Sequence, residues 1–241
     1  MTGIIDIHSH ILPGLDDGSS DMRESIHMLR LAAKQGITQV VATPHYSHSF
    51  QNTSPDQIRR LCREVQETVR RQMNTEILIW PGQEIMYDGD MLNLLANRSI
   101  LTIADSRYVL TEFLPSAPYS YIYSAMREIS LEGYIPILAH AERYIYLREK
   151  DRVDEIKSQG ACIQVNFRRI GGKWYDSTTR WCREMLRSQR IDFLGTDMHN
   201  IKERRPETGA ALEWMKKHLG REYLSKILYR NQQKVLADEK I

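Results

Sequence analysis

The stretch Ile4-Ile5-Asp6-Ile7-His8-Ser9-His10 joins a short apolar run to two histidines. Alternate side chains of a β-strand lie on the same face, so His8 and His10 can bind one ion together. A nearly continuous apolar run is typical of a strand that is covered on both faces, as in a parallel sheet. The stretch therefore predicts the first strand of a parallel sheet and, at its end, a metal-binding pair.

Similar runs of strand length recur along the chain. The predicted strands are Ile4–His8, Gln39–Thr43, Glu76–Trp80, Tyr108–Glu112, Ile135–His140, Ala161–Asn166 and Ile191–Thr196. Segments with helical periodicity separate them, and parallel neighbours need such crossovers. The sequence therefore predicts an α/β fold, and seven repeats favour a closed barrel over an open sheet.

Two of the intervening helices have recognisable ends. The first is expected to begin near Asp21, where Glu24 completes a capping box, and to end at Gly36. The second has Ser54 as its N-cap and Pro55 at the first helical position. These signals place helices directly after the first two predicted strands.

Length and composition limit the class of protein. The 241 residues are 41% hydrophobic, which allows one large domain over 1–241. The net charge of +2 and the lack of a long basic run exclude a dedicated nucleic-acid binder. No apolar stretch reaches the roughly 18 residues of a membrane span, so no membrane insertion is expected. Three scattered cysteines indicate reduced thiols and a cytoplasmic protein.

Metal-binding residue types follow the predicted strands. They are His8, His10, His45, Glu84, Glu112, His140, Asp197 and His199. The carboxyl ends of parallel barrel strands meet at one mouth, so these side chains are expected to converge. A lone histidine at a strand end is usually structural, but its recurrence at the same position argues against that alternative. Imidazole and carboxylate without thiolate suit zinc, manganese or iron, and so many donors indicate more than one ion.

The motifs around these residues resemble a known family. They are Ile7-His8-Ser9-His10, Ala42-Thr43-Pro44-His45, Pro81-Gly82-Gln83-Glu84, Ala139-His140-Ala141-Glu142-Arg143 and Thr196-Asp197-Met198-His199-Asn200. Together they resemble the PHP (polymerase and histidinol phosphatase) superfamily, and within it the bacterial CpsB/CapC/YwqE-type manganese-dependent tyrosine phosphatases. The resemblance extends from His8 to about Arg204.

The resemblance implies a distorted seven-stranded (β/α)7 TIM-like barrel, the PHP fold, that holds three divalent ions. The implied ligand sets are His8, His10, Glu84 and Asp197; Glu84, Glu112 and His140; and Asp17, His45 and His199. Arg143 and Arg204 would bind phosphate. Many PHP relatives have a histidine at the position of Glu112, whereas the tyrosine phosphatase branch has a carboxylate. Ala141 departs from that branch, which commonly has proline there.

Several alternatives stay open at this stage. Asp16 lies beside Asp17, and only the family spacing favours Asp17. The basic residue Arg205 follows Arg204, so an exposed basic turn is an alternative to a phosphate-binding role. One tyrosine of the segment 119–123 is a candidate for a phosphotyrosine pocket. His48 is either a substrate contact or a solvated loop residue.

The resemblance and the charges together predict a function. Three divalent ions outweigh four ligand carboxylates and a hydroxide by about one charge, which attracts a phosphate dianion. We expect metal-bound hydroxide to attack phosphotyrosine in a protein, and the resemblance implies a bacterial tyrosine kinase that regulates capsule or exopolysaccharide synthesis. Manganese is the expected metal, with iron or zinc as alternatives. Alternative functions are a small-molecule phosphatase of the histidinol-phosphatase type and a non-catalytic PHP scaffold. An oligomer is compatible with the sequence.

A second phosphatase signal is discounted. Cys162 and Arg168 have the C-x5-R spacing of thiol-based tyrosine phosphatases. That chemistry needs a tight loop of backbone amides around the phosphate, whereas Ile163, Val165 and Phe167 alternate as in a strand. A thiol buried in a strand is not expected to act as a nucleophile.

Overall fold

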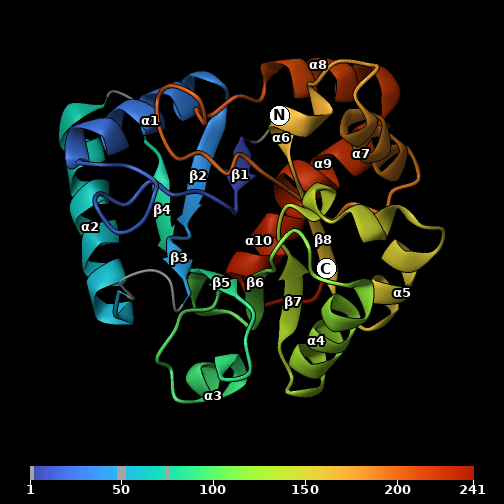
Figure 1. Cartoon of the computed structure of the whole chain (residues 1–241). Helices are drawn as coiled ribbons and strands as arrows, with labels where there is room; N and C mark the ends of the chain where they lie inside the picture. The colour runs from blue at the N-terminus through green and yellow to red at the C-terminus, as the bar shows by residue number, and fades with distance from the viewer. Residues whose placement is uncertain (1–2, 48–52, 74–75) are drawn as a thin grey trace.

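Helices and parallel strands alternate along the chain in the computed structural model (Figure 1), which describes residues 3–47, 53–73 and 76–241. The strands are β1 (Ile4–Asp6), β2 (Ile37–Ala42), β3 (His45–Tyr46), β4 (Leu78–Pro81), β5 (Glu84–Met86), β6 (Tyr108–Glu112), β7 (Ile135–Leu138), β8 (Cys162–Asn166) and β9 (Phe193–Gly195). The helices are α1 (Met22–Lys34), α2 (Pro55–Gln72), α3 (Met91–Ala96), α4 (Tyr119–Leu131), α5 (Arg152–Ser158), α6 (Phe167–Ile170), α7 (Ser177–Arg187), α8 (Gly209–His218), α9 (Arg221–Ser225) and α10 (Asn231–Leu236). Shorter helical turns are η1 (Ile103–Asp105), η2 (Ala141–Arg143), η3 (Ile145–Arg148) and the π-helical η4 (Lys226–Arg230).

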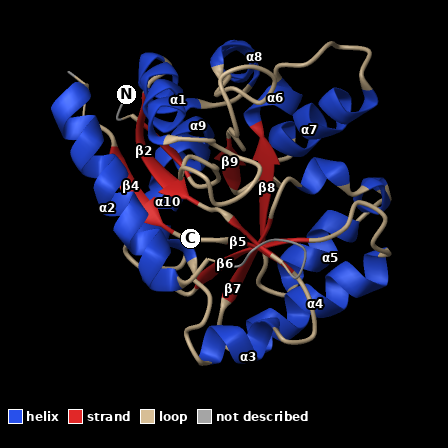
Figure 2. Cartoon of the chain, turned by 60° about the vertical axis from the view of Figure 1, so that its left-hand side comes forward, coloured by secondary structure: helices blue, strands red, loops and turns tan. Residues whose placement is uncertain are grey.

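The described strands form two parallel sheets, ordered β1-β2-β4 and β3-β5-β6-β7-β8-β9. A parallel bridge between Ser9 and Met198 joins the first sheet to the far end of the second. Beside it, the His10 N–H donates to the Met198 carbonyl over 2.9 Å. Figure 2 shows the strands gathered in the middle of the molecule with the helices around them. The predicted α/β fold is confirmed as a curled parallel sheet.

The described strands number nine in two sheets rather than seven in one. The second and third predicted strands are each interrupted: β3 begins three residues after β2 ends, and β5 begins three residues after β4 ends. Pro44 lies in the first gap and Pro81 ends β4. Proline has no N–H to donate to a strand ladder, so regular pairing stops at both places.

The predicted helix ends are confirmed. The Asp21 carboxylate caps α1 by accepting the Glu24 N–H over 2.8 Å. The Glu24 carboxylate reaches back to the Ser20 N–H over 3.0 Å, one residue earlier than a standard capping box. The chain leaves α1 through Gly36, whose φ of +87° favours glycine. At the start of α2, the Ser54 hydroxyl accepts the Gln57 N–H over 3.3 Å. Local sequence alone therefore fixes these ends.

The inner core lies within the curled sheet. Ile7, Leu110 and Phe193 are fully buried there, and α10 adds Val235 to the same cluster. The chain after α10 returns to the first residue of β6, where the Tyr108 hydroxyl donates to the Glu239 carbonyl over 2.8 Å. The C-terminal segment thus packs at the amino end of β6, the end opposite Glu112. No helix in the described part of the chain is both long and apolar enough to cross a bilayer.

Asp6 holds the junction of the two sheets together. Its fully buried carboxylate accepts hydrogen bonds from the Thr196 hydroxyl at 2.5 Å, the Thr196 N–H at 3.0 Å and the His8 N–H at 3.2 Å. Burial raises the pKa of the Asp6 carboxyl to about 6, against the opposing effect of these donors. Asp6 therefore has a structural role beside the histidine pair.

Candidate metal centre

The structure brings the predicted ligands together where strands end or, for His45 and Glu84, where the interrupted strands resume as β3 and β5. His8 and His10 follow β1, His140 follows β7, and Asp197 and His199 follow β9. Ligand atoms lie within 4.8 Å of one another in three groups: His10, Asp17, His45 and His199; His8, His10 and Glu84; and His45, Glu84 and Glu112. Residues from the whole length of the chain therefore meet at one place.

Glu84 lies at the centre of the cluster. Its Oε2 atom is 3.1 Å from His8 Nε2, 3.2 Å from His10 Nε2 and 3.2 Å from His45 Nδ1. Its Oε1 atom is 2.7 Å from His140 Nε2. Each carboxylate oxygen has about two lone-pair sites, so three imidazoles cannot all donate to the same atom. A carboxylate with both oxygens surrounded in this way is suited to bridging cations.

One further contact and one unpartnered atom are consistent with a donor set that fits cations. The Nε2 atoms of His8 and His10 are 3.3 Å apart. The Nδ1 atom of His140 is buried and has no hydrogen-bond partner among the residues the structure describes. Buried polar atoms are normally paired, and nitrogens that point at one another satisfy their lone pairs when they bind a metal. Mixed imidazole and carboxylate donors are the ligands of zinc, manganese and iron.

Asp17 belongs to this cluster and Asp16 lies behind it. Asp17 Oδ1 is 3.3 Å from His199 Nε2 and 3.5 Å from His45 Nε2. Asp16 Oδ2 instead accepts from His10 Nδ1 at 2.7 Å and from the His45 N–H at 3.0 Å. A carboxylate in that position orients the imidazole and increases its basicity. The geometry therefore separates the two aspartates that the sequence left as alternatives.

The carboxylates of the cluster favour positive charge on the histidines. Burial opposes a charge on His10, but the Asp16 and Glu84 carboxylates together outweigh it and raise the pKa of His10 to about 9. Glu112 and Glu84 likewise overcome burial and raise the pKa of His45 to about 9. The site is thus strongly attractive to cations, and protons occupy it where metal does not.

The pKa values of Glu84 and His199 are both lowered by their surroundings. Burial disfavours the Glu84 anion, yet His8 and His140 hold the pKa of its carboxyl well below its usual range. For His199, burial and the nearby His10 lower the pKa to about 4. Glu84 is therefore ionised and His199 neutral near pH 7, which are the forms that bind a metal ion.

Two amides of β8 support the cluster and were not predicted from the sequence. Gln164 Oε1 accepts the His140 N–H at 2.6 Å and lies 3.2 Å from His8 Nδ1. The Asn166 side-chain N–H donates to Asp197 Oδ2 at 2.9 Å. Both amides lie on the same face of a strand that is otherwise apolar. That alternation is the signal that could have identified them.

Both predicted phosphate-binding arginines contact Asp197. Arg143 Nη2 is 2.5 Å from Asp197 Oδ2, and Arg204 Nη2 is 2.7 Å from Asp197 Oδ1. Their side chains stay 34% and 32% exposed, so they lie at the opening of the site. Arg205 pairs instead with Glu207 at 2.8 Å, on the surface. Arg205 is therefore the exposed basic residue of this turn, whereas Arg204 faces the cluster.

The remaining histidines do not join the cluster in the described residues. His27 is exposed on α1. His218 stacks on Trp214 with ring centroids 4.5 Å apart and lies outside the site, on α8. His48 lies outside the residues that the structure describes. Both His27 and His218 are therefore helix residues away from the candidate ligands.

Cys162 is buried within β8, and burial raises the pKa of its thiol. Arg168 lies on α6, directly after the strand, so the segment between them is a strand and not a phosphate-binding loop. A neutral thiol inside a strand is a poor nucleophile. The rejection of a cysteine mechanism is confirmed in structural terms.

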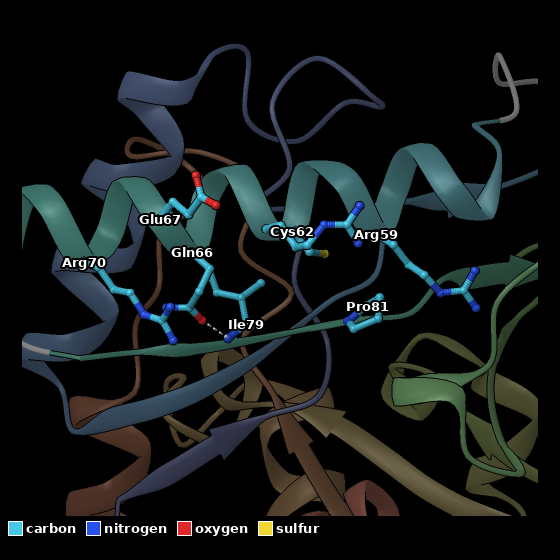
Figure 3. A pocket seen from close by; sticks show the side chains of 8 residues that line it. Arg59, Cys62, Gln66, Glu67, Arg70, Ile79 and Pro81 are labelled. Carbon is cyan, nitrogen blue, oxygen red and sulfur yellow. Dashed lines mark hydrogen bonds between the residues drawn. The ribbon is translucent and has the colours of Figure 1, made fainter.

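A cavity of about 420 Å³ lies between α2 and β4 (Figure 3), away from the histidine cluster. Arg59, Arg63 and Arg70 line it. On its floor, Gln66 Oε1 accepts the Ile79 N–H at 2.8 Å, and the Gln66 amide N–H donates to the Ile77 carbonyl at 2.8 Å. One side chain thus caps the exposed edge of β4, which protects that edge from pairing with another strand.

Known proteins match almost the whole chain. Residues 4–237 match the family described as capsular polysaccharide synthesis, CpsB/CapC. Tyrosine-protein phosphatase YwqE of Bacillus subtilis is 31% identical over 99% of this chain and 93% of its own length. Tyrosine-protein phosphatase CpsB of Streptococcus pneumoniae is 30% identical over 99% of this chain and its full length.

A solved structure agrees with the sequence relatives. It belongs to a study of YwqE from Bacillus subtilis and CpsB from Streptococcus pneumoniae, described as unique metal-dependent tyrosine phosphatases. It superposes with a TM-score of 0.90 at 31% identity and covers 99% of this chain and 96% of its own. The resemblance found in the motifs is confirmed: this chain belongs to the CpsB/CapC family, and the relatives above are named tyrosine-protein phosphatases.

Proposed function

We propose that this protein is a metal-dependent phosphatase that hydrolyses phosphotyrosine in proteins. The observation that carries the proposal is the convergence of five histidines and four carboxylates beside two partly exposed arginines. Relatives over the full length of the chain are named tyrosine-protein phosphatases, and the solved ones are described as metal-dependent. The chemistry of the donors and the names of the relatives therefore support the same activity.

The finer proposal is a centre of three divalent ions, with manganese as the metal and iron or zinc as alternatives. The ligand sets are His8, His10, Glu84 and Asp197; Glu84, Glu112 and His140; and Asp17, His45 and His199. When bound, such ions make water acidic enough to ionise near neutral pH and neutralise phosphoryl oxygens. The contacts of Glu84 with His8, His10 and His140 support its assignment to two of these sets.

The chain's own residues position the substrate and the ligands. Arg143 and Arg204 approach the same carboxylate from two sides, so an incoming phosphate meets two guanidinium groups at the opening. Asp16 and Gln164 fix the orientation of the imidazoles behind the centre. Because these groups are held before substrate arrives, little reorganisation is needed during the reaction.

A protein substrate is favoured over a small ester by the exposed apolar residues that follow β7 and β8. Ile145 and Tyr146 follow Arg143, and they are 61% and 42% exposed. Trp174 and Tyr175 follow β8 and are 76% and 58% exposed. Exposed aromatic residues of this kind are typical of protein-binding surfaces. The family description supports a role in capsule synthesis, and we propose a tyrosine kinase of that process as the substrate.

We extend the proposal to the organisation of the chain. Counting β2 with β3 and β4 with β5 as single interrupted strands gives a seven-stranded barrel of the PHP type. Residues 1–241 would form one phosphatase domain. Three buried, unpaired thiols support a cytoplasmic location. An oligomer is compatible with this arrangement.

Removal and return of metal tests the proposal. We expect chelation to abolish hydrolysis of a phosphotyrosine peptide and Mn²⁺ to restore it, whereas histidinol phosphate remains a poor substrate. The variant His140→Ala should resist reactivation, while His27→Ala, which alters an exposed histidine on α1, behaves as the wild type. Full activity of the metal-free protein would contradict the metal mechanism. Preference for histidinol phosphate would favour the small-molecule alternative, and failure to bind any metal would favour the scaffold.

A further inference from the structure

A second cavity, of about 470 Å³, is lined by residues that follow three of the proposed ligands along the chain. Its walls include Ser47, Met86 and Leu114, each two positions after a proposed ligand on β3, β5 or β6. These three strands are direct neighbours in one sheet. The cavity therefore continues the mouth of the barrel on the side of His45, Glu84 and Glu112.

Aromatic rings form a continuous path from the metal centre to this cavity. The His140 ring lies 6.1 Å from Tyr144, Tyr144 lies 6.1 Å from Phe113, and Phe113 lies 5.9 Å from Tyr121. The Phe113 N–H donates to the Tyr144 hydroxyl at 3.0 Å, which fixes the middle of the path. Tyr87 packs edge-on against Tyr121 at 5.5 Å. A further ring placed in the cavity would meet aromatic edges and faces in the geometry that such rings prefer.

Two of the apolar residues that line the cavity are exposed, beside the polar Asp88 and Ser116. Leu114 is 63% exposed and Tyr121 is 44% exposed. Tyr119 and Tyr123 pack against each other instead, and the Tyr119 hydroxyl donates to Glu155. Of the tyrosines at the start of α4, Tyr121 is therefore the one whose ring lines the cavity beside the metal centre.

We propose that this cavity binds the phenyl ring of the substrate's phosphotyrosine, with Leu114 and Tyr121 as its contacts, and so selects aryl over alkyl phosphomonoesters. The proposal rests on the proposed function. A single oxygen separates the tyrosine ring from phosphorus, so a ring whose phosphate lies at the metal centre must lie beside the ligands. Phe113 forms the floor for that ring, and Leu114 and Tyr121 shield it from water. An alkyl monoester leaves these surfaces uncovered.

Binding of two phosphonates to the manganese-loaded protein tests this assignment without requiring turnover. Benzylphosphonate carries a ring one atom from phosphorus, and methylphosphonate carries none. Calorimetry should show that the wild-type protein binds benzylphosphonate more tightly. Leu114→Ala and Tyr121→Ala should lower the ratio of the two affinities by about three- to tenfold each. Tyr121→Phe keeps the ring and should keep most of the ratio.

The control is Leu131→Ala, because Leu131 is 69% exposed at the end of α4 and does not line the cavity. It should have the wild-type ratio. Equal affinities of the two phosphonates in the wild type, or an unchanged ratio in both cavity variants, would overturn the proposal. A protein that prefers benzylphosphonate but does not hydrolyse phosphotyrosine would support the ring site and contradict the proposed function, so the two failures are distinguishable.

Discussion

Asp16 and Asp17 are consecutive residues whose carboxylates contact different histidines of the same cluster. Asp16 Oδ2 lies 2.7 Å from His10 Nδ1, the ring nitrogen that faces away from Glu84. Asp17 Oδ1 lies 3.3 Å from His199 Nε2. One aspartate therefore orients a ligand from behind, and the other lies among the candidate ligands themselves.

This division of roles predicts opposite results for the two alanine variants. Asp17→Ala removes a ligand, so the reconstituted protein should hold one manganese ion fewer than the wild type. Asp16→Ala removes only the support of His10, so the number of ions should stay the same while affinity falls by about 10- to 100-fold. Elemental analysis and metal titration measure both quantities. Loss of an ion in Asp16→Ala but not in Asp17→Ala would reverse the assignment.

Replacing either arginine at the opening of the site should reduce catalysis without loss of metal. Arg143→Ala and Arg204→Ala should each lower kcat for a phosphotyrosine peptide by roughly 100-fold, because each removes a cation that faces the phosphoryl oxygens. Arg205→Ala is the matched control, since Arg205 pairs with Glu207 on the surface. Steady-state kinetics with metal analysis separates the two effects. Equal activity of Arg204→Ala and Arg205→Ala would exclude Arg204 from phosphate binding.

Because Cys162 is buried, we expect its replacement to leave catalysis unchanged. Cys162→Ser should keep the wild-type kcat/KM, because the burial that raises the pKa of this thiol also keeps it from acting as a nucleophile. Thiol-alkylating reagents should leave the folded protein active. A loss of several orders of magnitude in the serine variant, with intact metal content, would restore the cysteine mechanism.

The raised pKa of Asp6 predicts that the wild type and Asp6→Asn differ in stability by an amount that depends on pH. Burial raises the pKa of its carboxyl from 3.8 to about 6, so the folded protein favours the neutral form. Its contribution to stability is complete below pH 3.8 and is lost as pH rises through about 6. Asn at this position does not titrate. The free energy of unfolding of the wild type, minus that of Asp6→Asn, should therefore fall by up to about 3 kcal/mol between about pH 4 and pH 7.

Urea unfolding of the two metal-free proteins across this range measures the difference. Subtracting the variant removes the titration of groups that both proteins share. A difference that stays constant with pH would show that Asp6 has the same pKa in the folded and unfolded chains.

The sequence was sufficient to predict most of the titratable residues that the structure brings together. His8, His45 and Glu112 lie at or just beyond strand ends, and the topology of a parallel sheet brings such ends together whatever their separation along the chain. The Tyr108–Glu112 strand has the predicted bounds. Capping signals such as Asp21 act over a few residues, so they were also predictable.

Other features depend on tertiary contacts that no local pattern encodes. Gln164 and Asn166 support the cluster through amides whose partners are more than 20 residues away along the chain. Asp16 and Asp17 have the same chemistry and adjacent positions, so only the path of the loop separates them. The breaks in the second and third strands follow from Pro44 and Pro81, whose effect on pairing depends on their neighbours in the sheet.

Anomalous diffraction at the manganese edge, from crystals of the reconstituted protein, tests the central claim most directly. We predict three peaks inside the cluster, with Glu84 bridging two of them and Asp17, His45 and His199 around the third. The same three positions should lose their signal in crystals of chelated protein. An absence of anomalous scattering between His8, Glu84 and Glu112 under saturating manganese would contradict the account.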